Sequence, residues 1–393
     1  MFSTLSTVII IKLYIKGEIK MKFSIKKEVL LQSLNSVSKA LSSKNLIPIL
    51  SGIKFNLTNE GLFLSASDND ISIESFIPKE KLENIENIGS TVIQGKYILE
   101  IIRKLEGRIV NIELLDGIKV LISCCNSEFN LNSMDALEFP NLNLEEKKNP
   151  IIIKKDDFKE LINKTSFAIS TQETRPVLTG INFKIVDNNL ECIATDSYRL
   201  AKKHIVLNDN IKEEINIVIP GKNLIELTKI IEEKDNDIEM HIFNNKVLFK
   251  FDNTLFQTRV LSGTFPDVNR LIPSNFNLSI KANTSELYNV IDRASLLTSE
   301  KDKNIIKFEC DNNNVIVSSN SPEIGKVEEK IEIEKNNEEN IKIAFSSKFM
   351  MDAIKTIESK NVILNFNNDI NPIIVLDEND NSLLQLILPI KTY

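Results

Sequence analysis

Residues 174–203, TRPVLTGINFKIVDNNLECIATDSYRLAKK, decide the fold because the chain uses the same unit more than once. Apolar and polar residues alternate on both sides of the polar turn at 186–189, which predicts two β-strands joined by that turn. The alternation breaks at Asp-Ser-Tyr-Arg, residues 196–199, before a third strand begins. The stretch LIPILSGIKFNLTNEGLFLSASDNDISIES at residues 46–75 follows the same order.

Three pairs of residues in the two stretches lie a constant 128 positions apart: Pro48 and Pro176, Gly52 and Gly180, Asp68 and Asp196. A constant offset of this kind indicates a duplicated domain. A third copy begins at residues 278–280, which follow the equivalent strand at 151–153 by 127 positions. The third copy lacks the Pro and Gly landmarks, so its assignment depends on the order of its predicted strands and helices.

Each copy combines two amphipathic helices with short alternating strands. We therefore expect an α+β fold of three tandem two-helix, multi-strand domains, with boundaries at residues 21–147, 148–273 and 274–393. Residues 1–20 precede the first clear strand pattern, and their apolar run is too short to span a bilayer. We expect residues 1–20 to be a disordered extension, or the product of a mis-assigned start with Met21 as the first residue.

The composition is that of an ordinary globular protein, with 42% hydrophobic and 26% charged residues among 393. A net charge of −7 argues against nucleic acid coating the whole surface, although a local basic face remains compatible with it. The four cysteines, Cys124, Cys125, Cys192 and Cys310, have no metal-ligand spacing and are expected to be buried strand thiols.

No motif in the sequence predicts catalysis. Pro220-Gly221-Lys222 lacks the spacing of a phosphate-binding loop, and residues 68–70, Asp-Asn-Asp, lack the Gly and Glu that complete a calcium loop. The chain holds only two histidines. We therefore expect a protein that is not an enzyme and that uses neither a metal nor another cofactor.

Lysine and arginine recur on or beside the predicted helices of all three copies. They are Lys26, Lys27, Lys39, Lys44, Lys96, Arg103, Lys104, Lys154, Lys155, Lys159, Lys164, Lys222, Lys229, Lys348, Lys355 and Lys360. A protein that binds duplex DNA without sequence preference needs a basic face, because phosphate contacts carry no sequence information. Acidic residues lie between these cations, so an ordinary solvated surface explains the pattern equally well.

Several short motifs, together with the tripled unit, resemble a known family. They are the Pro-x-Leu-x-Gly strand starts at 48–52 and 176–180, Ala-Thr-Asp-Ser-Tyr-Arg-Leu-Ala at 194–201, Phe-Pro-Asp at 265–267 and Leu-Pro-Ile at 388–390. With these features the chain resembles the bacterial DNA sliding clamp, the beta subunit of DNA polymerase III. The resemblance extends from Met21 to the C-terminus.

The resemblance implies a non-catalytic processivity factor in the cytoplasm, associated with the nucleoid during replication. Two three-domain subunits would form a head-to-tail dimeric ring, with helices lining a central hole that encircles double-stranded DNA. A peptide-binding pocket would tether the DNA polymerase III catalytic subunit. The same pocket would accept the clamp-loader complex, translesion polymerases, mismatch-repair proteins and ligase through short apolar motifs.

The family's site positions carry over onto three sets of residues. DNA contacts fall on Lys44, Lys96, Gln172 and Arg175. The partner-peptide pocket falls on Leu178, Thr195, Ser197, Tyr198, Arg199, Leu200, Pro266, Arg270, Leu271, Leu388, Pro389 and Ile390. The dimer interface falls on Phe129 and Leu131 of the first domain and on Leu296 and Leu297 of the third.

Some positions depart from the family pattern or have a simpler explanation. Pro176, Val177 and Asp302 replace residues that are aromatic in relatives, and this departure affects the expected peptide preference. Without the resemblance, an ordinary core is the better explanation for Leu200, Leu271 and Leu388, and a covered edge strand for Phe129. A monomeric protein-interaction scaffold that never encircles DNA is the alternative function, and the mass of the native particle distinguishes the two.

Overall fold

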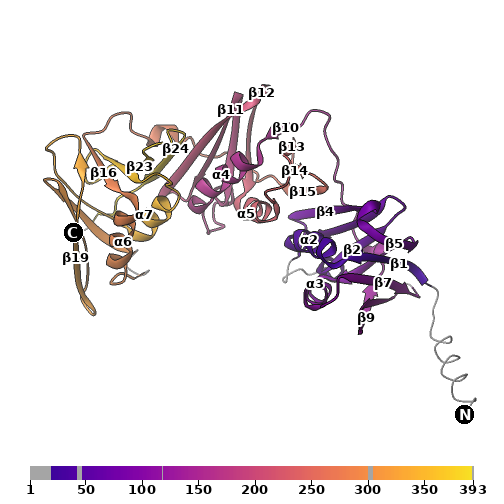
Figure 1. Cartoon of the computed structure of the whole chain (residues 1–393). Helices are drawn as coiled ribbons and strands as arrows, with labels where there is room; N and C mark the ends of the chain where they lie inside the picture. Colours follow the sequence, from indigo (N-terminus) through magenta and orange to yellow (C-terminus); the bar gives the residue numbers. More distant parts are fainter. Residues whose placement is uncertain (1–18, 42–46, 117, 300–303, 392–393) are drawn as a thin grey trace, which may run out of the picture. The chain divides into compact units, whose positions relative to one another are not determined.

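The computed structural model describes residues 19–41, 47–116, 118–299 and 304–391. The chain divides into two compact units, one from Met1–Ile151 and Lys229–Arg259 and the other from Ile152–Thr228 and Val260–Tyr393. The two units are described separately, and Figure 1 labels their elements. β10 (Ile151–Ile153) and α5 (Gly221–Ile230) lie where the chain passes from one unit to the other.

The first unit is built on one extended antiparallel sheet. Its strands are β1 (Ile19–Lys26), β2 (Gly52–Leu57), β3 (Gly61–Ser67), β4 (Ile71–Pro78), β5 (Leu82–Asn87), β6 (Gly89–Gln94), β7 (Ile109–Leu115), β8 (Lys119–Cys124), β9 (Ser127–Met134), β13 (Ile238–Ile242), β14 (Lys246–Phe251) and β15 (Thr254–Arg259). They run in the order β13-β14-β15-β4-β3-β2-β6-β9-β8-β7-β1-β5. The pairing of β15 with β4 joins strands of the first and second predicted repeats in one sheet.

Two helices, α2 (Lys27–Val37) and α3 (Gly95–Lys104), pack together in this unit. The predicted apolar stripe of α2 is present, because Leu30, Leu34 and Val37 are fully buried. α3 begins at Gly95, where a Cβ atom would clash with the side chain of Leu41. A side chain at this position would require the end of the Leu41 side chain to move.

The second unit contains two antiparallel sheets. One has the order β11-β12-β24-β23-β22-β16-β20 and the other β19-β18-β17-β21. Their strands are β11 (Gly180–Thr195), β12 (Arg199–Pro220), β16 (Leu278–Asn283), β17 (Ile305–Asp311), β18 (Asn314–Ser321), β19 (Gly325–Glu332), β20 (Glu334–Lys335), β21 (Ile341–Ser346), β22 (Asn361–Phe366), β23 (Ile373–Asp377) and β24 (Leu383–Ile387). The helices are α4 (Lys155–Thr165), α6 (Thr284–Ser295) and α7 (Ser347–Ile354).

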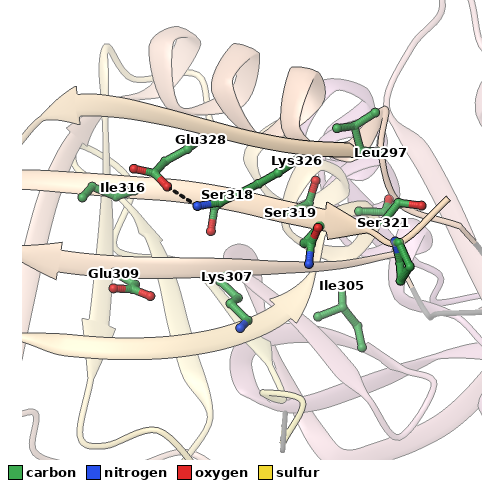
Figure 2. Close-up of a pocket in the computed structure, with 13 residues that line it drawn as sticks. Leu297, Ile305, Lys307, Glu309, Ile316, Ser318, Ser319, Ser321, Lys326 and Glu328 are labelled. Atoms are coloured by element: carbon green, nitrogen blue, oxygen red, sulfur yellow. Dashed lines mark hydrogen bonds and ion pairs between the residues drawn. The ribbon is translucent and has the colours of Figure 1, made fainter. Parts of the chain in front are cut away.

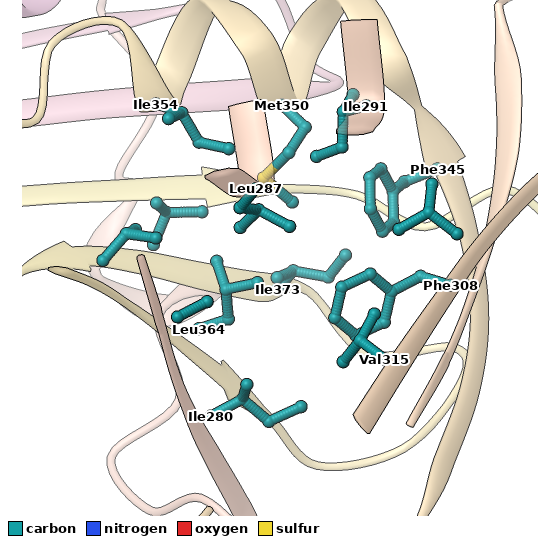
Figure 3. Close-up of a cluster of buried hydrophobic side chains, with 14 of the residues drawn as sticks. Ile280, Leu287, Ile291, Phe308, Val315, Phe345, Met350, Ile354, Leu364 and Ile373 are labelled. Atoms are coloured by element: carbon teal, nitrogen blue, oxygen red, sulfur yellow. The ribbon is translucent and has the colours of Figure 1, made fainter. Parts of the chain in front are cut away.

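Figure 3 shows the core that α6 and α7 form with these strands. Leu287 and Ile291 of α6 meet Met350 and Ile354 of α7 over Phe308 and other strand residues, and all of them are buried. The helix stripes therefore pack on the sheets as the amphipathic pattern predicts. No helix among the described residues is long and apolar enough to cross a membrane.

Three local expectations need correction. β11 is one strand through the predicted turn at 186–189, and the ladder with β12 is irregular beside Asp187, whose φ is 55°. β1 begins at Ile19, two residues inside the predicted extension, because Ile19 pairs with Leu115 of β7; residues 1–18 lie outside the described residues. Cys125 is exposed and not buried, because it occupies the turn between β8 and β9.

Candidate functional site

The turn between β11 and β12 is built around the carboxylate of Asp196. Its Oδ1 accepts hydrogen bonds from the backbone N–H groups of Tyr198 at 2.9 Å and Arg199 at 3.0 Å. The Thr195 hydroxyl donates to the Arg199 carbonyl oxygen at 2.6 Å and accepts from the Ser197 N–H at 3.2 Å. Ser197 has a φ of 76°, a left-handed conformation that a non-glycine residue adopts at a cost. These bonds hold the turn and fix the position of Tyr198.

The side chain of Arg199 joins this turn to α7. Its Nη1 lies 2.6 Å from Oδ2 of Asp352, and its Nε donates to Oδ2 of Asp196 at 3.1 Å. The guanidinium also lies 4.5 Å from the ring centre of Phe349 and 5.4 Å from that of Phe167. These contacts hold the Arg199 side chain in place and position the turn.

The segment after β24 runs beside the turn. The Leu388 N–H donates to the carbonyl oxygen of Tyr198 at 2.9 Å, and the Ile390 N–H donates to that of Ala344 at 2.7 Å. β12 also pairs with β24, with Leu200 opposite Leu386. Backbone hydrogen bonds therefore bring residues from two predicted repeats together on one surface.

Exposed apolar side chains lie above a buried cluster at this surface. Tyr198 is 62% exposed, Leu271 55% and Leu388 37%, whereas Leu178 and Leu200 are buried. The cluster beneath consists of Ile193, Leu200, Val268, Ile374 and Leu386, with Phe265, Ile272, Phe276, Leu376 and Leu384 packed against it. The core explanation therefore holds for Leu200 but not for Leu271 or Leu388.

The remaining predicted pocket residues differ in burial, and Ile390 lines a separate pocket with Lys307 and Lys342. Thr195 is buried, Ser197, Pro266 and Arg270 are exposed, and Pro389 and Ile390 are partly buried. Arg270 Nε lies 3.4 Å from the Asp267 carboxylate in an exposed ion pair of small energetic weight. We call the surface formed by Tyr198, Leu271 and Leu388 the apolar ledge.

The predicted DNA-contacting residues are exposed where the structure describes them. Lys96 is in the first turn of α3, and Gln172 and Arg175 lie in the loop before the 3-10 turn Pro176–Thr179. Lys44 lies outside the described residues. The three described side chains belong to two different units, Lys96 to the first and the other two to the second.

Two of the cations that the sequence placed on exposed helix faces point inward. Lys164 is almost completely buried and pairs with Glu160 at 2.9 Å and Asp380 at 3.4 Å. Lys27 donates from Nζ to the carbonyl oxygen of Leu105. A helical period identifies a polar stripe, but the period alone does not distinguish a solvated cation from one that meets a buried carboxylate.

The predicted interface residues lie on β9 and at the C-terminal end of α6. Phe129 is 38% exposed and Leu131 partly exposed on β9, while Leu296 at the end of α6 is 74% exposed. Leu297 lines a cavity of about 680 Å³ on the outer side of β17, β18 and β19. Figure 2 shows polar and charged side chains projecting from these strands into it.

Three consecutive stretches match the domains of one protein family. Residues 21–143 match the N-terminal domain of the DNA polymerase III beta subunit, 152–267 its central domain and 269–391 its C-terminal domain. The chain belongs to the DNA polymerase III beta subunit family. The beta sliding clamp of Bacillus subtilis (strain 168) is 43% identical over 378 residues, covering 95% of this chain and 100% of that protein. That of Staphylococcus epidermidis (strain ATCC 12228 / FDA PCI 1200) is 42% identical over 377 residues, with the same coverage.

Solved structures agree with this assignment. The crystal structure of the DNA polymerase sliding clamp from Bacillus subtilis superimposes with a TM-score of 0.91 over 95% of this chain and 100% of that one. The DNA polymerase III beta chain of Streptococcus pneumoniae gives a TM-score of 0.90 at 33% identity, with the same coverage. The resemblance and the three-domain α+β clamp fold are confirmed. The chain is a non-catalytic subunit that acts as a DNA polymerase processivity factor.

The sequence did not predict the residues that hold the turn between β11 and β12 in place. Phe167, Phe349 and Asp352 surround Arg199, yet Asp352 lies 153 positions after it. No local pattern in the sequence connects them. The sequence offers one indirect signal. The turn at residues 196–199, Asp-Ser-Tyr-Arg, contains many polar groups, and these groups need hydrogen-bonding partners.

A buried ion-pair cluster lies beside these contacts in the second unit. Lys203 of β12 pairs with Asp380 at 2.7 Å and with Glu160 at 2.8 Å, and Lys164 contacts the same two carboxylates. Burial alone would raise the pKa of Asp380. Hydrogen bonds from Lys203 and Ser382 outweigh burial and hold the pKa of this carboxyl well below its usual range. The cluster ties α4, β12 and the segment before β24 together.

One group in the first unit has the composition of a metal site. Glu146, Glu239 and His241 place potential ligand atoms within 4.8 Å of one another. However, His241 Nδ1 already accepts a hydrogen bond from the Lys147 N–H at 2.9 Å, and its Nε2 lies 3.5 Å from Glu239. The Lys250 ammonium already lies 2.6 Å from Glu146. Lys250 also lies 3.9 Å from Glu239, so both carboxylates already have a cationic partner, and the group fastens the segment around Lys147 to β13 and β14.

Proposed function

We propose that two copies of this chain close head to tail into a ring around duplex DNA and tether the replicative polymerase to its template. The full-length likeness to sliding clamps, at 43% identity, carries this proposal. A ring would explain how a protein with a net charge of −7 stays on DNA. A closed ring cannot dissociate sideways, so a few cations around the hole are enough for DNA contact. The likeness gives no support to the alternative of a monomeric scaffold.

The subunit contact that we propose joins β9 of one subunit to β19 of its partner. Over the described residues, β9 pairs fully with β8 but with β6 only at its C-terminal end, and β19 pairs with β18 alone. Open edges of this kind readily pair with another chain. Phe129 and Leu131 would then meet Leu296 and Leu297 beside α6, which packs against β19. The contact would remove four partly or largely exposed apolar side chains from water.

Partner proteins would insert short apolar peptide segments against the apolar ledge. Its three exposed side chains supply the apolar area, and the hydrogen bonds around Asp196 hold the neighbouring turn ready for binding. The partners in this proposal are the DNA polymerase III catalytic subunit, the clamp-loader complex, translesion polymerases, mismatch-repair proteins and ligase. Because they share one ledge, they would bind one at a time to each subunit.

Duplex DNA would contact Lys96, Gln172 and Arg175 together with Lys44. The described side chains are exposed, and a lysine, an amide and an arginine are all suitable donors to phosphate oxygens. Few and weak contacts allow the ring to slide. The repeat boundaries at 21–147, 148–273 and 274–393, and a cytoplasmic location with nucleoid association during replication, belong to the same proposal.

Two measurements test the ring. Sedimentation analysis should give twice the 44.6 kDa subunit mass at micromolar concentration, whereas a strict monomer would support the scaffold. Clamp loaded by a clamp loader onto nicked circular DNA should remain bound at high salt and be released when the circle is linearised. Retention on linear DNA with free ends would mean ordinary affinity and would overturn the topological proposal.

A further inference from the structure

Two adjacent thiols converge on one small space in the first unit. Cys124 ends β8 and is buried, whereas Cys125 occupies the turn before β9, is exposed and has a φ of 52°. Both sulfur atoms lie within 2.5 Å of the point where a Cβ on Gly107 would sit. One atom that forms bonds of roughly 2.3 Å to sulfur can therefore bind both thiols after a small rotation of the two cysteine side chains.

Gly107 is what makes room for this pair. It lies between α3 and β7, and any larger residue there would collide with both sulfurs. The other two cysteines, Cys192 and Cys310, are buried on separate strands of the second unit. Among the residues that the structure describes, paired thiols with one exposed member therefore occur at this turn alone.

We propose that Cys124 and Cys125 form a dithiol site for trivalent arsenicals and that both sulfurs bind one arsenic atom. Cys125 meets the reagent first because its thiol is exposed. Burial raises the pKa of the Cys124 thiol, which makes Cys124 the slower nucleophile of the two. With an arsine oxide, R–As=O, two As–S bonds form and the bond between arsenic and oxygen is lost. The oxygen leaves as water with the two thiol protons, and neither arsenic nor sulfur changes oxidation state.

The second As–S bond distinguishes this site from an ordinary exposed cysteine. Once arsenic is attached to Cys125, the neighbouring Cys124 thiol reacts with it intramolecularly. The effective concentration of Cys124 at the arsenic atom is then higher than the concentration of a monothiol in solution. The adduct should therefore resist glutathione, which offers one thiol, and yield to dithiothreitol, which offers two.

The test uses the full-length reduced protein and one equivalent of phenylarsine oxide, followed by excess glutathione and intact-mass measurement. Wild type should retain a single adduct at least tenfold longer than Cys125→Ser, and trypsin should place it on peptide 120–147, whose only cysteines are Cys124 and Cys125. Cys310→Ala, which also removes one thiol, should behave as wild type. Circular dichroism establishes that each variant is folded.

A second variant keeps both thiols and alters only their surroundings. Gly107→Ala displaces the sulfurs, so its adduct should be lost to glutathione faster than that of wild type. The proposal is overturned if wild type forms no adduct, if it loses the adduct as fast as Cys125→Ser, or if the adduct maps outside peptide 120–147.

Discussion

The backbone N–H of Leu388 donates a hydrogen bond to the carbonyl oxygen of Tyr198 over 2.9 Å. This bond places two exposed apolar side chains, which are separated by 190 positions in the sequence, on the same apolar ledge. The ledge is thus assembled from chain segments that have no sequence relationship to each other, and each segment can be tested separately.

Replacing Tyr198 with alanine should weaken the binding of an apolar partner peptide by about 30-fold, the effect of losing roughly 2 kcal/mol at an aromatic anchor. The aromatic ring is mostly exposed, so the melting temperature should hardly change. Fluorescence anisotropy with a labelled peptide from the polymerase subunit measures the affinity. Tyr97→Ala removes a comparably exposed ring from the first unit and should bind the peptide normally; equal losses in both variants would rule out the ledge.

Arg199→Ala should lower the free energy of unfolding by about 3 kcal/mol, because Asp352 and Asp196 would keep their charges without their partner. Arg199→Lys keeps the charge but loses the two-sided contact with Phe349 and Phe167, so its stability should be intermediate. Urea unfolding measures all three proteins. A double variant, Arg199→Met with Asp352→Leu, should be more stable than Arg199→Ala. If it is not, the unpaired carboxylate is not the cause of the loss.

Asp380 predicts a dependence of stability on acid pH. A carboxyl group whose pKa is depressed by folding stabilises the protein fully above its unfolded pKa of about 3.9. That contribution disappears as the pH falls through the lower folded pKa. Asp380→Asn should therefore be less stable by about 3 kcal/mol at pH 7 and should lose less further stability than wild type between roughly pH 5 and pH 2.

Unfolding by urea across this pH range compares the two proteins. Asp369→Asn, which removes an exposed carboxylate from the same unit, serves as the matched control and should follow wild type. Parallel curves for Asp380→Asn and wild type would show that the ion-pair cluster does not control acid stability.

Phe129→Asp should convert the dimer to monomer at micromolar concentration, because ring closure would bury an unpaired charge. The monomer itself should remain folded, since Phe129 is partly exposed on β9. Leu137→Asp introduces the same charge at a highly exposed leucine of the same unit and should leave the mass unchanged. Sedimentation velocity gives both masses, and a dimer that survives Phe129→Asp would place the interface elsewhere.

Local periodicity was enough to predict the repeat and its helices. The buried stripe of Leu30, Leu34 and Val37 follows directly from helical spacing, because burial on one face of a helix leaves a local pattern. The predicted turn at 186–189 failed for a related reason. A polar run also fits an irregular part of a long strand pair, and β12 supplies partners on both sides of Asp187.

Long-range pairing limited the prediction of the site. Lys164 has the spacing of a surface residue, and its long-range partners Glu358 and Asp380, the latter 216 positions later, cannot be read from its neighbours in the sequence. Arg199 was assigned to the peptide pocket by resemblance, and its partners on α7 and beside α4 could not be identified from neighbouring residues. Buried ion pairs join residues that no sequence period relates, so they become visible only in three dimensions.

The pairing of β12 with β24 has a consequence for synthesis of the protein. During translation β12 leaves the ribosome long before β24, and until then its side at Arg199–Lys203 lacks the strand that completes the sheet. A nascent or truncated chain without β24 therefore cannot display the apolar ledge. Partner binding at the ledge, as proposed above, would therefore require a chain that has been translated past β24.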